Sequence, residues 1–161
     1  MRLTPLLTNL ARSATAAGYM DVADWANSER QGYRSDVPVY RRVTGVPMGF
    51  SPMKGWVPLF VENKALLREV GAHGLRQSIG HIENAIANSD SGKAYVHYTS
   101  EEIGLINIAA GTRFAQMASA IDIGALQRIV TSVTSLARQW SHQIHARTPP
   151  TPPKDPPTIA A

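Results

Sequence analysis

The strongest constraint on the fold is an amphipathic pattern over residues 122–145. Large apolar side chains recur there every three or four residues, which predicts one side of a long helix. Its members are Leu126, Ile129, Val130, Val133, Leu136, Ala137, Trp140 and Ile144. Burying such a stripe contributes roughly 1.5–3 kcal/mol for each large side chain, so we expect this helix to organise the core.

A stripe of this kind must be covered by protein, either within the fold or across a subunit contact. Five of its members are therefore candidate interface residues: Leu126, Ile129, Val133, Leu136 and Trp140. This pattern favours a protein that works by packing against other protein.

The remaining chain predicts an α+β fold that is mainly α, in a single globular domain over residues 1–147. Prolines and glycines crowd residues 30–62, so this segment is expected to hold turns and short strands such as Val37–Val43 and Val57–Val61. Before the proline-bounded β element over 30–62, a helix is expected over 3–29 with a break at Gly18. After it, a helix capped by Asn63 is expected over 63–88, and a strand over 94–99. Two amphipathic helices are expected over 100–145, the first of them capped by Ser100. Residues 148–161 are expected to form an extended Pro-rich tail.

Composition excludes several functions. The chain has 161 residues and no cysteine, which rules out thiol catalysis, disulfides and cysteine-ligated metal sites. His142 and His145 lie one helical turn apart, but no further ligand is evident near them, so we expect no metal and no cofactor. No apolar run approaches the roughly 18–20 residues of a membrane span. The first 20 residues lack a continuous apolar core, so no secretory signal is expected, and a cytoplasmic or virion location is favoured.

Positive charge gathers in residues 30–56, which carry five Lys and Arg residues against one acid. Aromatic side chains are interleaved with them, and this combination suits phosphate pairing and base stacking. The candidate nucleic-acid residues are Arg34, Arg41, Arg42, Lys54, Tyr40 and Trp56. The net charge of the whole chain is only +4, and no helix-turn-helix, zinc finger or RNA-binding signature accompanies the segment.

The segment from His97 to Ile106, His-Tyr-Thr-Ser-Glu-Glu-Ile-Gly-Leu-Ile, resembles the opening strand and helix of some ADP-ribosyltransferase toxin domains. The resemblance implies that His97 contacts the nicotinamide-side ribose of NAD. It covers about ten residues. Such a domain needs later strands with a tyrosine pair and an acidic residue, whereas this chain has no tyrosine after Tyr98 and only Asp122 and Asp155 as later acids.

The Pro-rich tail contains the pattern Pro149-x-x-Pro152-x-Lys154. Src-homology-3 domains read this minimal pattern as a polyproline II helix in an aromatic groove. A stiff spacer is the alternative interpretation of the same composition.

These patterns favour a non-enzymatic structural, assembly or adaptor protein, homo-oligomeric or part of a larger complex, such as a bacterial or bacteriophage particle. Nucleic-acid binding through residues 30–56 is the first alternative. An ADP-ribosyltransferase-like domain around His97 is the second.

Overall fold

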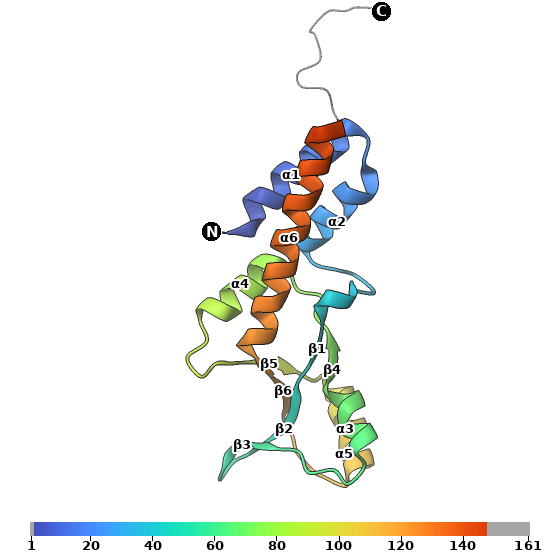
Figure 1. Ribbon diagram of the computed structural model, residues 1–161. Coiled ribbons are helices and arrows are strands. Elements are labelled where there is room, and N and C mark those ends of the chain that lie inside the picture. The colour runs from blue at the N-terminus through green and yellow to red at the C-terminus, as the bar shows by residue number, and fades with distance from the viewer. Residues whose placement is uncertain (1, 148–161) are drawn as a thin grey trace, which may run out of the picture.

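The computed structural model describes residues 2–147 as an elongated molecule with a helical end and a sheet end (Figure 1). The helices are α1 (Leu3–Ala17), α2 (Met20–Gln31), α3 (Lys64–Gly71), α4 (Ile79–Ala87), α5 (Ser100–Ala110) and α6 (Ile123–Arg147). The strands are β1 (Arg42–Thr44), β2 (Val46–Ser51), β3 (Gly55–Pro58), β4 (Ala72–Gly74), β5 (Lys93–His97) and β6 (Met117–Asp122), and a 3-10 helix, η1, spans Val39–Arg41. Of residues 2–147, 57% are helix and 19% strand, which confirms the α+β, mainly α class.

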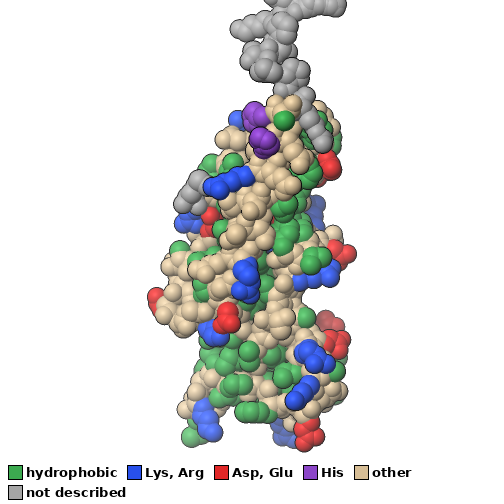
Figure 2. All heavy atoms as spheres, viewed as in Figure 1, with side chains coloured by type: hydrophobic (Ala, Val, Ile, Leu, Met, Phe, Trp, Pro, Cys, Tyr) green, Lys and Arg blue, Asp and Glu red, His purple; other side chains and the backbone are tan. Residues whose placement is uncertain are grey.

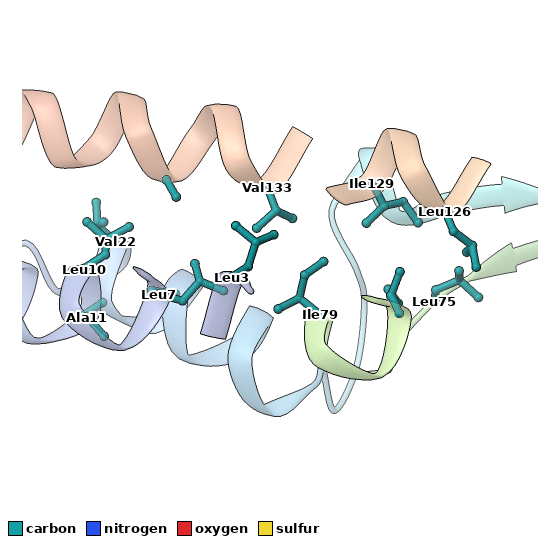
Figure 3. Close-up of a cluster of buried hydrophobic side chains, with 14 of the residues drawn as sticks. Leu3, Leu7, Leu10, Ala11, Val22, Leu75, Ile79, Leu126, Ile129 and Val133 are labelled. Carbon is teal, nitrogen blue, oxygen red and sulfur yellow. The ribbon is translucent and has the colours of Figure 1, made fainter. Parts of the chain in front are cut away.

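The helical end forms around α6, which packs against α1, α2 and α4. α1 and α2 are joined at Gly18, whose φ of 84° lies in the left-handed region that favours glycine. Figure 3 shows Leu3 and Leu7 of α1 pointing toward Val133 of α6. The expected break at Gly18 is confirmed, and so is the role of the last helix as an organiser of the core.

The sheet end contains a four-stranded antiparallel sheet in the order β3-β2-β6-β5, and β1 pairs with β4 in a separate two-stranded sheet. In the larger sheet, β6 is central and pairs Ala118 with Met48 on one side and with His97 on the other. A second apolar cluster lies between this sheet and α5, with Leu59, Tyr98, Ile106 and Met117 buried. The chain therefore has one core in the helical end and a second at the sheet end.

The single helix expected over 63–88 is wrong, because α3 ends at Gly71 and the chain then forms β4 before α4 begins. Gly71 crosses the backbone of Gly45 closely: Gly45 N donates to Gly71 O at 2.7 Å, and a Cβ on Gly71 would lie 2.4 Å from Gly45 O. The apolar spacing over 63–88 is helical on both sides of this crossing, which is why it predicted one helix. Asn63 does cap α3, accepting hydrogen bonds from Ala65 N and Leu66 N.

The two helices expected over 100–145 are present as α5 and α6, but the first ends at Ala110 and β6, which was not expected, separates it from the second. Gly111, which has a φ of 70°, caps the end of α5. The Asn107 side chain then holds the following loop through Phe114 N and Phe114 O, at 3.0 and 2.8 Å. β6 is buried from Met117 to Ile121, and its middle residues, Ala118, Ser119 and Ala120, are all small, so it lacks the alternation that would have predicted a strand.

Two smaller corrections concern element boundaries. Of the strand expected at Val37–Val43, only the last two residues lie in β1, because η1 precedes it, and the strand expected at Val57–Val61 is displaced to β3. The cap of α5 is Thr99 rather than Ser100: Thr99 Oγ1 accepts from Glu102 N, and Glu102 accepts from Thr99 N. This reciprocal arrangement is a capping box, which fixes the helix start one residue earlier.

Within residues 2–147, no helix is both long and apolar enough to cross a membrane. The Pro-rich tail expected over 148–161 lies outside the described residues.

Candidate functional site

The two sides of the four-stranded sheet differ in what covers them. On one side Ala94, Val96 and Ile121 pack into the core beneath the helices. Since residues directly opposite in an antiparallel pair project to the same side, the register defines the other side. This open sheet face consists of Val46, Met48, Phe50, Trp56, Tyr95 and His97, with Ala118 and Ala120 beneath them. Figure 2 shows hydrophobic side chains gathered over this end of the molecule.

Trp56 is the centre of the open sheet face. Its ring lies 5.9 Å from the Tyr95 ring at an interplanar angle of 24°, and 6.0 Å from the His97 imidazole. Phe50 meets it edge-on at 5.4 Å. Trp56 and Tyr95 come from the two outer strands, so their rings meet above β2 and β6. This is possible because Ala118 and Ala120 between them are small; they are 0% and 6% exposed.

The open sheet face is apolar at its centre and charged at its rim. Val46 is 51% exposed and Tyr95 40%, so these two side chains are accessible. At one end Lys93 forms an ion pair with Asp122, and the hydrogen bond from Lys93 lowers the pKa of Asp122. At the other end Lys54 follows Ser51 in the turn between β2 and β3, with its backbone N donating to Ser51 Oγ.

A groove of about 620 Å³ adjoins the open sheet face at Phe50. It is lined by residues 50–52 and 112–116, that is, by the end of β2 and the loop before β6. Arg113 brings the one charged side chain into this lining, and it is exposed. The groove thus continues the apolar surface of the open sheet face as far as the positively charged side chain of Arg113.

The structure does not bring the six candidate nucleic-acid residues together. Trp56 belongs to the open sheet face and Lys54 lies next to it, whereas Arg34 and Arg42 are exposed elsewhere. Arg41 is 0% exposed, so it is not available to a phosphate. Tyr40 is half-buried and belongs to the same polar network as Arg41.

The buried network is centred on the Arg41–Glu29 ion pair, with Arg41 Nη2 2.6 Å from Glu29 Oε1. Arg41 Nη1 also donates to the carbonyls of Leu75 and Gln77, at 2.8 and 2.7 Å. The Tyr33 ring covers the guanidinium, with its centroid 4.9 Å from Cζ. Arg41 thereby joins α2 to the segment after β4, a structural task that its position in a basic segment does not reveal.

Two tyrosines complete the shell of Glu29. Tyr33 Oη donates to Glu29 Oε2 at 2.6 Å, and Tyr40 Oη donates to the same oxygen. Burial, followed by the bond to Glu29, raises the pKa of Tyr33 and raises that of Tyr40 to about 12. Both phenols are therefore neutral donors at physiological pH. Trp25 Nε1 donates to Tyr40 Oη at 2.8 Å and extends the network to the surface.

The segment that resembles ADP-ribosyltransferases places its first two residues on opposite sides of the sheet. His97 lies on the open sheet face, against Trp56. Tyr98 is buried on the covered side, where its hydroxyl donates to Val70 O at 2.7 Å and lies 3.2 Å from Ser119 Oγ and 3.4 Å from His73 Nε2. Burial lowers the pKa of His73. Asp122 is engaged by Lys93, four residues along β5 from His97.

The five candidate interface residues divide into two groups. Leu126, Ile129 and Val133 are buried in the core of the helical end, so the fold itself covers them (Figure 3). Leu136 and Trp140 are half-buried and line a shallow groove against α2. Among the described residues, no group of three or more His, Asp or Glu side chains could hold a metal ion.

Sequence reasoning missed the open sheet face as a unit. Phe50 and Trp56 stand out as aromatics in the basic segment, and Tyr95 and His97 alternate along one strand. Joining them requires β6, whose short run of small residues gave no strand signal.

Comparison with known proteins identifies a family. No curated protein and no solved structure matches the chain. The AbiTii family model matches residues 1–158, which is nearly the entire sequence. The chain therefore belongs to AbiTii, a bacterial abortive-infection family associated with defence.

Proposed function

We propose that this protein is a non-enzymatic assembly protein of a bacterial defence complex, and that it self-associates through the open sheet face. The observation that supports this is an accessible sheet surface with aromatic and aliphatic side chains at its centre and charges at its rim. Protein interfaces have this anatomy, with aromatics and methionine enriched and charges depleted at the core. Membership of a defence family favours a cellular complex over a virus particle.

A second copy of the chain suits this surface. Lys93 and Asp122 neutralise each other at one end of the face, so two copies can meet without strong like-charge repulsion there. Two-fold contacts use the same patch on both subunits, and they are the commonest arrangement among oligomers. Trp56, held by three neighbouring rings, is a preformed anchor of the kind that dominates interface energetics.

Charge substitutions at exposed positions test the proposal without disturbing the core. Val46→Glu and Tyr95→Glu place like charges opposite one another in a face-to-face dimer, and Val39→Glu is the control, since Val39 is 77% exposed in η1. We expect wild type and Val39→Glu to sediment as a discrete multiple of the 17.5 kDa chain. In Val46→Glu and Tyr95→Glu, the dissociation constant of that oligomer should be at least tenfold higher. A wild-type protein that remains monomeric at high concentration would contradict the proposal.

The same surface favours a second candidate, single-stranded nucleic acid, because Trp56 and Tyr95 are stacked and accessible and Lys54 lies at the rim. Base–aromatic stacking contributes about 1–3 kcal/mol for each base. The same protein samples can therefore be titrated into a labelled single-stranded oligonucleotide at several salt concentrations. This alternative predicts that binding weakens as the salt concentration rises. It also predicts that the slope of log K against log salt concentration is smaller by about one in Lys54→Ala. The absence of binding at low salt would reject it.

A further inference from the structure

A second aromatic surface lies on α6, in the helical end and away from the sheet. A groove of about 280 Å³ lies where α6 meets α2 and the residues that precede β1. We call it the aromatic groove; the residues that matter are Asp21, Trp25, Pro38, Tyr40, Leu136 and Trp140. It combines three aromatic rings, a proline and one carboxylate.

The aromatic groove is held in place by the buried network. Trp25 donates to Tyr40, and Tyr40 donates to Glu29, which is paired with Arg41. These bonds fix two of the three rings before any ligand arrives, which lowers the entropic cost of binding. Within residues 2–147, the structure records no hydrogen-bond partner for the Trp140 indole N–H, which leaves a donor for a ligand carbonyl.

Proline-rich segments are recognised by this combination of groups. A polyproline II helix docks in aromatic-lined grooves and exposes its carbonyls to indole donors, and a basic residue beside the prolines pairs with an acid at the rim. The chain itself carries such a segment immediately after α6: Pro149-Pro150-Thr151-Pro152-Pro153-Lys154. We propose that residues 149–154 bind the aromatic groove, with Lys154 paired to Asp21.

The chain length permits this contact. Trp140 lies seven residues before the end of α6, which corresponds to roughly 10 Å of helix. Seven residues, the length of the segment 148–154, would span roughly 22 Å in a polyproline II helix. The segment is thus long enough to reach from the end of α6 to the groove of its own chain, or of a neighbouring copy. The contact is independent of the open sheet face.

The full-length protein offers an internal control, because it has three tryptophans and only Trp25 and Trp140 line the groove. We compare their indole N–H signals by NMR in the wild type and in Pro149→Ala/Pro152→Ala, with signals assigned by single Trp→Phe variants. The proposal expects the Trp25 and Trp140 signals to shift and that of Trp56, in β3, to stay unchanged. Identical spectra, or a shift at Trp56 alone, would overturn it.

Charge reversal tests the pairing of Lys154 with Asp21. Asp21→Lys and Lys154→Asp should each reproduce the shift seen in the proline variant, and the double variant should restore the wild-type signals. A double variant that behaves as the sum of the single variants would overturn the pairing.

Adding a peptide of residues 148–157 to the proline variant should also restore the signals, whereas the peptide with both prolines replaced should not. Dilution of the wild type then identifies the donor of the segment: signals independent of concentration assign it to the same chain, and signals that change assign it to a neighbouring copy.

Discussion

At the scale of single residues, the most consequential contact is the ion pair between Glu29 and Arg41. Both side chains are fully buried. Tyr33 and Tyr40 donate to Glu29, and Arg41 donates to two backbone carbonyls. Such a pair adds little net stability over an apolar replacement, but breaking it leaves an uncompensated buried charge. Its importance is that it specifies how α2 meets the segment after β4.

Two adjacent arginines provide a direct test of that contact. Arg41→Ala should lower the free energy of unfolding by about 3–5 kcal/mol, because Glu29 is left buried and unpaired. Arg42→Ala should change it by no more than about 0.5 kcal/mol, because Arg42 is exposed on β1. Urea denaturation measures both values. Equal effects for the two substitutions would show that the buried pair has no special role.

At the scale of elements, the close backbone crossing of Gly45 and Gly71 decides where α3 ends. A side chain at Gly71 would collide with the Gly45 carbonyl, a backbone atom that cannot move aside as a side chain can. The crossing brings β4 beside β1, with Val43 opposite His73. The short two-stranded sheet therefore depends on two glycines that lie 26 residues apart.

A matched pair of glycine substitutions checks this interpretation. Gly71→Ala should destabilise the protein by about 1–3 kcal/mol through overpacking against Gly45. Gly104→Ala, inside α5 with nothing within 4 Å of the new methyl group, should stabilise it by about 1 kcal/mol. The two thermal unfolding curves should therefore shift in opposite directions. A stabilised Gly71→Ala variant would mean that the crossing is loosely packed.

Sequence patterns predicted the elements with local signals and missed those that depend on distant contacts. Gly18, Asn63 and the stripe on α6 act through their immediate neighbours along the chain. The break at Gly18, the cap at Asn63 and the place of the α6 stripe in the core are confirmed. β4 and β6 form only because other strands are there to pair with them. The burial of Arg41 likewise depends on Glu29, which lies 12 residues away on another helix. A charge count along the sequence cannot distinguish such an arginine from one that binds phosphate.

At the scale of the whole molecule, the two apolar clusters are separate. The larger fills the helical end and includes Leu7, which is 0% exposed; the smaller lies beneath α5 and includes Ile106, which is 8% exposed. They share no buried side chain among the described residues. Each end can therefore lose packing without directly opening a cavity in the other.

This separation predicts that core substitutions at the two ends are additive. Leu7→Ala and Ile106→Ala should each cost about 2–5 kcal/mol, and the double variant should equal their sum within about 0.5 kcal/mol. Guanidinium denaturation of the four proteins gives the coupling energy. A coupling energy well above 1 kcal/mol would indicate that the two clusters behave as one packed core.

The direct junction of β6 and α6 has a mechanical consequence. Asp122 ends the central strand and Ile123 begins the helix, with no loop to absorb movement between them. The first turn of α6 therefore takes its position directly from the end of β6. Whatever fixes the direction of the central strand thus also sets the starting point of the helix around which the helical core is built.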